Sequence, residues 1–471
     1  MDTEEDLLEP VSPTGQYLNS SVLSLSILSV LESETPIRDD HFRYLSILRD
    51  DFLPVNSRFS SIMVAEKNGI QKWKKVEVNL ADHVIVPTLP RGMSPEFYDE
   101  YLLDYLSKLG MDPLPENRPL WEVHLFRYPT RNAAGSIIAK FHHSLGDGYS
   151  LLGALLSCLR RLDNPSIPLS FPSFQSSNSS KRGDYSIITR SLRGIPQVSS
   201  WIANTVVDFG ASLLKSSFVK DVESPIRSLH DGVEFLPMAF TTIEFSMDAI
   251  KIIKTKLKMT INDVITGIIL LGSRLYMEGE KNNSGKSNSN ALVLMNTRNL
   301  GGYKSVGEMV NPKANTSLWG NHFAFLHVPL PKLSTASLSN PVNFVYEAHK
   351  IIKRKRNNAA VLLTGALLDK LRELRGPETA AKYIHSTLKN SSITITNLIG
   401  PVEKMSVDDL PIKGLYFFVT GSPQSSQVTV ISYAGKLRIG IGVEKDFIDP
   451  HKFKSCIADA FNMISQAAVV P

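Results

Sequence analysis

Residues 136–157, SIIAKFHHSLGDGYSLLGALLS, place a strand pattern, a glycine-containing turn and an apolar helix pattern in direct succession. Neighbouring residues of a strand point to opposite faces, so the two adjacent histidines of this stretch cannot have the same environment. Gly146 and Gly148 permit a positive φ and a close backbone approach around Asp147. Ser150 can then cap the helix that follows. A strand that leads straight into a helix is typical of α/β folds.

Strand and helix patterns alternate over most of the chain. A Ser- and Pro-rich stretch at 163–184 interrupts them, because its composition fits neither the strand period nor the helix period. Apolar residues then recur every three or four positions over 191–215, which predicts an amphipathic helix. With 471 residues the chain exceeds the size of one domain, about 100 to 200 residues. We therefore expect a first domain at 1–164, a linker with a helix at 165–236 and a second domain at 237–471.

Charge and cysteine content exclude several classes of protein. The 51 Lys and Arg nearly balance the 46 Asp and Glu, so composition gives no reason to expect a nucleic-acid partner. The two cysteines are Cys158 and Cys456, far apart in apolar settings, which fits a reducing compartment. The acidic N-terminus lacks the pattern of a signal peptide. The apolar stretch at 22–31 is too short to cross a bilayer, which takes about 20 residues, and is predicted to be a strand.

The histidine pair indicates proton-transfer chemistry. His143 shares its parity with Phe141 and Ala139, so we expect His143 to be buried and His142 to lie with Lys140 on the other face. A neutral imidazole can take a proton from a hydroxyl group. Opposite-facing histidines cannot easily chelate one ion, so we expect no metal. The chain has no G-x-S-x-G elbow and no activated cysteine, so covalent catalysis is unsupported.

Residues 142–148, HHSLGDG, resemble the H-H-x-x-x-D-G signature of the wax ester synthase/diacylglycerol acyltransferase family. Further stretches resemble family elements in the same order, and the opening EPVSPTGQYLNSSVLSL is similar to the plant branch in particular. These stretches are PLWEVHLF at 119–126, TINDVITGII at 260–269, NHFAFLHVPLP at 321–331 and ITNLIGP at 395–401, with Thr396 where serine is usual. The resemblance extends from about residue 10 to 465.

The resemblance implies an α/β fold of two chloramphenicol-acetyltransferase-like domains, with mixed sheets, flanking helices and an active-site tunnel between them. It implies that His143 is the general base and that Asp147 belongs to the same catalytic motif. The aspartate is expected to act structurally, paired with Arg298 on a second-domain strand, as in related acyltransferases. Substrate contacts are expected from His142, Gly148, Asn262, Thr396 and Asn397.

Some of these residues have a second interpretation from the sequence. Thr396 and Asn397 can stabilise an oxyanion, or they can make the turn before Gly400 and Pro401. Thr260 and Asp263 form a capping-box pattern, which favours a cap for Asp263 and leaves Asn262 as a tunnel residue.

The family resemblance implies an acyl-CoA-dependent O-acyltransferase that makes wax esters from long-chain alcohols, triacylglycerol from diacylglycerol, or both. Acyl-CoA is a co-substrate, and no cofactor is expected. A non-catalytic lipid-binding paralogue and transfer to a soluble plant metabolite are the alternatives. We expect peripheral attachment to the cytosolic face of the endoplasmic reticulum, with plasma membrane or cytosol as alternatives. The contact is expected at 191–215 or at the basic run 349–358, although the first could pack on the body and the second could be a solvated helix face.

Overall fold

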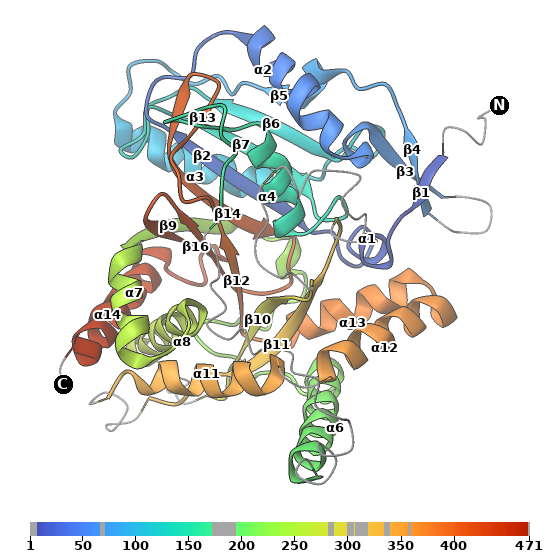
Figure 1. The fold of residues 1–471 in the computed structure, drawn as a ribbon, viewed down its shortest axis with the longest axis vertical. Helices are drawn as coiled ribbons and strands as arrows, with labels where there is room; N and C mark the ends of the chain where they lie inside the picture. The colour runs from blue at the N-terminus through green and yellow to red at the C-terminus, as the bar shows by residue number, and fades with distance from the viewer. Residues whose placement is uncertain are drawn as a thin grey trace, which may run out of the picture.

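Two mixed β-sheets form the body of the protein, and helices pack against them (Figure 1). The computed structural model describes residues 7–65, 71–171, 195–280, 287–298, 306, 319–333, 340–356 and 359–469. The first sheet has the order β5 (Val84–Ile85), β6 (Trp121–Phe126), β7 (Gly135–His142), β2 (Ser26–Ser33), β14 (Leu410–Thr420), β13 (Met405–Val407) and β8 (Arg160–Arg161). The second has the order β11 (Phe323–Pro329), β10 (Asn290–Asn296), β12 (Ile393–Ile399), β15 (Ser426–Tyr433), β16 (Lys436–Glu444) and β9 (Met238–Ser246).

A small third sheet, β1 (Leu7–Pro10), β4 (Gln71–Lys75) and β3 (Ser61–Ala65), lies beside the first. The helices of the first half are α1 (Pro13–Tyr17), α2 (His41–Ile47), α3 (Pro95–Met111) and α4 (Gly148–Ser157). The later helices are α6 (Ile195–Ser217), α7 (Met247–Leu257), α8 (Ile261–Gly279), α11 (Asn343–Arg356), α12 (Ala360–Arg375), α13 (Pro377–Lys389) and α14 (Pro450–Val469). In Figure 1, α6 projects from one end of the molecule beside α12.

Strand β7 lies inside the first sheet, between β6 and β2, and every one of its residues is buried. A strand with both faces covered has no solvent side, so its alternation does not separate buried from exposed residues. Our expectation that only His143 would be buried is therefore wrong. His142 is 4% exposed and His143 is 6% exposed.

The chain crosses between the halves at β13 and β14. These strands lie within the expected C-terminal domain, yet β14 pairs with β2, from Ile412 opposite Ser33 to Thr420 opposite Ser26. β13 pairs with both β14 and β8. A division at 164 and 237 therefore describes the order of the chain but not the strand content of the first sheet.

The strand expected at 22–31 is found as β2, and the helix expected at 191–215 is found as α6. Residues 191–194 and 172–184 of the expected helix and linker lie outside the described residues. Within the described parts of the chain, no helix combines the length and the apolar character needed to cross a bilayer.

Candidate active site

His143 lies at the end of β7, and its side chain is held by one amide. The His143 Nδ1 atom is 2.8 Å from Asn321 Oδ1, and Asn321 Nδ2 donates to the His143 carbonyl oxygen at 2.9 Å. A carbonyl oxygen only accepts, so the second bond fixes the orientation of the amide. Asn321 Oδ1 must then accept from a protonated Nδ1. The other ring nitrogen, Nε2, is left as the proton acceptor.

Burial keeps this imidazole neutral. The pKa of His143 is lowered by loss of solvent, and nearby Asp147 and the hydrogen bond to Asn321 oppose the shift. Phe323 contacts the ring, with the centroids 5.6 Å apart in an edge arrangement. A neutral histidine with a fixed tautomer has the protonation state that a general base requires.

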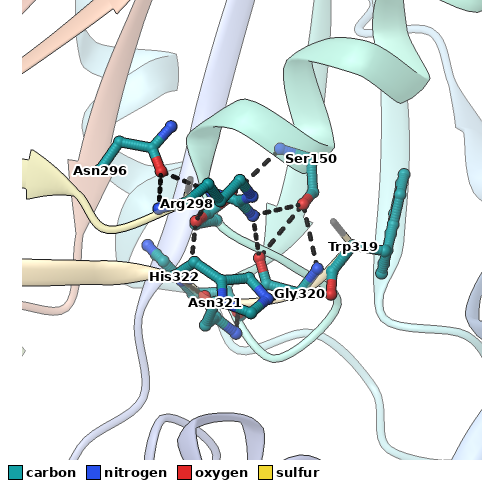
Figure 2. Close-up of polar contacts among 9 residues, drawn as sticks. Ser150, Asn296, Arg298, Trp319, Gly320, Asn321 and His322 are labelled. Atoms are coloured by element: carbon teal, nitrogen blue, oxygen red, sulfur yellow. Dashed lines mark hydrogen bonds and ion pairs between the residues drawn. The ribbon is translucent and has the colours of Figure 1, made fainter. Parts of the chain in front are cut away.

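Asp147 and Arg298 form a clamp between the two halves. Figure 2 shows Arg298 of this clamp beside Ser150 and Gly320. Arg298 Nη1 lies 2.6 Å from Asp147 Oδ2, and Nη2 lies 2.9 Å from Oδ1. Arg298 Nη2 also donates to the Gly320 carbonyl oxygen at 2.8 Å and to Ser150 Oγ at 3.1 Å. The Arg298 and Asp147 side chains are 1% and 8% exposed. The predicted pairing is therefore present as a buried, bidentate contact.

The turn after β7 differs from its expected geometry in two respects. Asp147, not Ser150, is the N-cap of α4, because its carboxylate accepts from Ser150 N at 3.1 Å. Neither Gly146 nor Gly148 has a positive φ. The glycines are needed for close approach instead: a Cβ on Gly146 would lie 2.8 Å from Ser150 Cβ, and one on Gly148 would lie 2.9 Å from Leu398 Cδ1.

A cavity of about 100 Å³ opens between the halves beside His143. Gly148, Thr396 and Asn397 line it, together with Asp147 and Arg298. Most of the remaining wall is apolar, with Leu25, Ile27, Leu152, Phe171, Leu294, Phe323, Phe325, Leu398, Phe417 and Val419 among the lining residues. The geometry thus gathers polar groups at one point of an apolar space, as small-molecule sites commonly do.

Two of the expected substrate contacts lie outside this lining. His142 Nε2 is 3.0 Å from Ser24 Oγ and its Nδ1 is 2.8 Å from Ser144 Oγ, so both ring nitrogens already have partners. Burial lowers the pKa of His142 to about 3. Asn262 reaches the lining only through Asn397, whose Nδ2 donates to Asn262 Oδ1 at 3.3 Å. These contacts fit positioning roles for His142 and Asn262.

The capping box of α8 is confirmed. Thr260 Oγ1 accepts from Asp263 N, and Asp263 Oδ2 accepts from Thr260 N at 2.9 Å. Asp263 also binds His349 Nδ1 at 2.8 Å, which links α8 to α11. Among the residues that the structure describes, no group of His, Cys, Asp and Glu side chains could hold a metal ion.

Sequence reasoning missed Asn321 and His322. The stretch 321–331 resembles a family block, but its sequence does not indicate the amide that fixes His143 or the backbone N–H of His322, which donates to Asp147 Oδ2 at 2.9 Å. The available signal is the pair of polar residues, Asn321 and His322, directly before the strand pattern FAFLHVP.

Family models match both halves of the chain. The wax ester synthase/diacylglycerol acyltransferase catalytic domain matches residues 38–265, and the WS/DGAT C-terminal domain matches residues 319–465. Wax ester synthase/diacylglycerol acyltransferase 4 of Arabidopsis thaliana is 30% identical over 95% of this chain and 88% of its own length. The chain belongs to the wax ester synthase/diacylglycerol acyltransferase family. Wax ester synthase/diacylglycerol acyltransferase 11 of the same plant is 27% identical over 98% of this chain and 95% of its own.

Solved structures place this family member in a wider fold group. The wax ester synthase/diacylglycerol acyltransferase from Marinobacter aquaeolei VT8 matches with a TM-score of 0.60 and 16% identity, over 98% of this chain and 100% of that one. The starter condensation domain of rhizomide synthetase RzmA matches with a TM-score of 0.54 and 12% identity, over 98% and 95%. The chloramphenicol-acetyltransferase-like two-domain α/β fold is therefore confirmed.

Proposed function

We propose that this protein is an acyl-CoA-dependent O-acyltransferase that makes wax esters from long-chain alcohols, triacylglycerol from diacylglycerol, or both, with His143 as the general base. One observation carries the proposal: the bond from Nδ1 to Asn321 leaves Nε2 of a buried, neutral imidazole as proton acceptor beside a largely apolar cavity. No described residue bonds Nε2. A hydroxyl group bound in the cavity would donate a hydrogen bond to Nε2.

The reaction needs one proton carrier and no covalent enzyme intermediate. The acceptor hydroxyl gives its proton to His143 Nε2 as its oxygen attacks the thioester carbonyl. The tetrahedral oxyanion then collapses, the C–S bond breaks and the proton passes from His143 to the CoA thiolate. The products are an ester and free CoA. A positioned base of this kind contributes about 10²- to 10⁴-fold.

The oxyanion needs a donor, and two side chains qualify. Thr396 and Asn397 both line the cavity, on β12, and the Thr396 hydroxyl and the Asn397 amide can donate. Asn397 Nδ2 already donates to Asn262, which orients the amide. One oxyanion donor contributes about 10²- to 10³-fold. We therefore assign oxyanion stabilisation to Thr396 and Asn397, with Asn262 behind them.

The test is transfer of a radiolabelled acyl group from acyl-CoA by purified protein, with a long-chain alcohol and diacylglycerol offered separately. The wild type should form ester, and His143→Ala should lose about 10²- to 10⁴-fold in rate. His451→Ala is the matched control, because His451 is exposed on α14. Ester formed equally by wild type and His143→Ala would refute the base assignment. Binding of lipid without any turnover would favour the non-catalytic paralogue, and transfer only to a water-soluble acceptor would favour the metabolite alternative.

We also propose peripheral attachment to the cytosolic face of the endoplasmic reticulum through α6. The described part of α6 turns polar residues inward, with Asp208 3% and Thr205 6% exposed. Its exposed residues include the apolar Val206, Val207 and Leu214, which are 64%, 65% and 54% exposed, beside the polar Asn204 and Ser217. A helix with an exposed apolar face is suited to the boundary of a bilayer.

Sedimentation with phospholipid vesicles tests the attachment. Replacing Val206, Val207 and Leu214 by Asp should release the protein into the supernatant. Phe42→Asp removes a more exposed apolar side chain, 86% exposed on α2, and should leave sedimentation unchanged. If the α6 variant still sedimented and Phe42→Asp did not, the membrane contact would lie elsewhere than on α6. The plasma membrane and the cytosol would then be the locations to examine.

A further inference from the structure

A second cavity, about 420 Å³ in volume, adjoins the catalytic one. It is enclosed by α6, α12, α13 and β11, and we call it the side chamber. Phe323 and Phe325 line both cavities, so these two rings form the boundary between them. The catalytic cavity of about 100 Å³ is small for long-chain substrates, whereas the side chamber lies in the ordinary range for ligand sites, about 300 to 1,000 Å³.

One face of β11 runs from the catalytic histidine into the side chamber. Phe323, Phe325 and His327 alternate along the strand and so share a face. Phe323 contacts His143, and Phe325 contacts Phe323 with the centroids 5.5 Å apart. His327 is about 13 Å along the strand from Phe323, at about 3.3 Å per residue. That span is close to the length of one lipid chain, about half of the 30 Å hydrocarbon core of a bilayer.

The far end of this path has a buried polar group without a partner. His327 is 2% exposed, and neither of its ring nitrogens has a hydrogen-bond partner among the described residues. Burial, together with the nearby Lys355 and Lys215, lowers the pKa of His327 to about 3, so the ring is neutral. A neutral histidine has one N–H to donate. An acceptor inside the chamber would satisfy it.

At the same end, Lys355 and Arg354 share one buried carboxylate, that of Asp208. The Lys355 side chain is 11% exposed, and its Nζ is 3.8 Å from Asp208 Oδ1. Arg354 Nη2 holds the same oxygen more closely, at 2.8 Å. Burial lowers the pKa of Lys355 to about 8; Asp208 opposes this shift, and Lys215 and Arg354 add to it. Lys355 therefore shares the Asp208 carboxylate with Arg354, which is closer to it. A second anion beside Lys355 would stabilise the lysine charge.

The rest of the side chamber suits a hydrocarbon chain. Its apolar lining residues are Phe323, Ala324, Phe325, Leu326, Ala360, Val361, Ala366, Leu368 and Ile384, and serine, threonine and tyrosine side chains complete the wall. Among the described residues, the one other carboxylate in the lining is Asp369 of α12, which is exposed and so lies at the rim. The chamber thus offers an apolar strip along β11 with a Lys and a His at its end, which match a single carboxylate on a long chain.

We propose that the side chamber binds the terminal carboxylate of a long-chain hydroxy acid, whose hydroxyl group reaches His143 past Phe323 and Phe325. The inference rests on the acyl transfer proposed above and names an acceptor class for it. The hydroxyl loses its proton to His143 and forms the new ester bond, CoA leaves as the thiol, and the free carboxylate stays on Lys355 and His327 throughout. The product is an ester that keeps one carboxylate.

Isothermal titration calorimetry tests the site without turnover. The ligands are ω-hydroxypalmitate and its methyl ester, which has the same chain and hydroxyl group but no charge. Wild type should bind the carboxylate roughly 10- to 100-fold more tightly, the effect of hydrogen bonds to a charged group. Lys355→Met should remove most of this preference. Lys353→Met is the matched control, because Lys353 is exposed on the same helix, and it should keep the preference.

Substitutions of His327 give an independent readout. His327→Gln retains a donor and should keep part of the preference, whereas His327→Leu should lose more of it. Equal affinity of wild type for the acid and the methyl ester overturns the inference. So does an equal effect of Lys353→Met and Lys355→Met, which would indicate only a surface charge. A fall in CoA affinity in Lys355→Met, with carboxylate affinity unchanged, would assign the chamber to the thioester and also overturn it.

Turnover separates the two proposals. In wild type, the ratio of kcat/KM for ω-hydroxypalmitate over its methyl ester should exceed about tenfold, and Lys355→Met should bring that ratio toward one. If a simple long-chain alcohol is acylated but the acid has no advantage over its ester, the proposed function stands and this inference fails. If no alcohol is acylated while the carboxylate still binds through Lys355, the proposed function fails and the binding site remains.

Discussion

At the scale of single residues, the site depends on an amide as much as on a histidine. Asn321 accepts from His143 Nδ1 at 2.8 Å and donates to the His143 carbonyl oxygen at 2.9 Å. The ring could otherwise carry its proton on either nitrogen. Fixing the proton on Nδ1 keeps every molecule of the enzyme in the tautomer with Nε2 free, so Asn321 is a positioning residue.

Asn321→Ala and Asn321→Asp should differ in their pH profiles. The alanine variant loses the acceptor, and we expect about a tenfold fall in kcat/KM, the worth of one hydrogen bond. The aspartate variant keeps an acceptor and adds a negative charge, which raises the pKa of His143. Because the base works when neutral, the rate is lost as pH falls through that pKa. The acid limb of the kcat/KM profile should therefore move to higher pH in Asn321→Asp, and an unmoved limb would contradict the role.

Sequence reasoning found the residues that carry a motif and missed the one that acts through space. His143, Asp147 and Arg298 were expected, and the last two are in contact. Asn321 is 178 positions from His143, so no local pattern connects them. The burial of His142 was missed for a related reason: alternation gives the face of a side chain, but only the neighbours of the strand decide whether that face is covered.

At the scale of elements, helix α8 contains glycines where other helices approach its backbone. A Cβ on Gly267 would lie 2.8 Å from Val345 Cα and 2.9 Å from Val345 N, on α11. A Cβ on Gly272 would lie 2.8 Å from Ile457 Cα, on α14. The sequence predicted α8 and its cap correctly, since both follow from local spacing. It could not show that these glycines are contacts, because glycine inside a helix otherwise counts against the helix.

Gly267→Ala should destabilise the protein, although alanine is the better helix former. Overpacking of a tight contact costs about 1–3 kcal/mol, more than the helix propensity of about 1 kcal/mol that alanine contributes. Gly210→Ala in α6 is the matched control: a Cβ there has nothing within 4 Å, so we expect unchanged or higher stability. Urea unfolding midpoints of the two variants give the answer. If both variants gain stability alike, the close helix contact does not control packing.

At the scale of the whole molecule, the halves are joined by strands and by buried charges. β14 belongs by sequence to the second half but completes the first sheet by pairing with β2. Glu32 of β2 and Arg438 of β16 form an ion pair at 2.6 Å between the sheets. The alternating pattern predicted an α/β class, the length of the chain predicted two domains, and the family resemblance implied that the two are similar. The alternating pattern could not predict the crossover, because strand pairing between distant segments leaves no periodic trace in either segment.

The Asp147–Arg298 clamp is a charged contact between the halves at the catalytic cavity, and a double-mutant cycle tests it. Asp147→Asn keeps an acceptor for Ser150 N, since asparagine is a good N-cap, but leaves the Arg298 charge buried and unmatched. Arg298→Met likewise leaves the charge of the Asp147 carboxylate buried and unmatched. Breaking a buried pair from one side costs about 3–5 kcal/mol, so each single variant should lose folded yield and urea resistance.

The double variant should lose less than the sum of the single losses, because neither unmatched charge remains. The second measurement is kcat, expressed per folded molecule so that a loss of folded yield does not affect it. Since Asp147 is held by Arg298, His322 N and Ser150 N rather than by His143, the clamp should act on the relative position of the halves. We therefore expect kcat to fall in the single variants and to recover partly in the double variant. Additive losses of stability, or a single variant with full yield and full activity, would show that the halves are held together without this clamp.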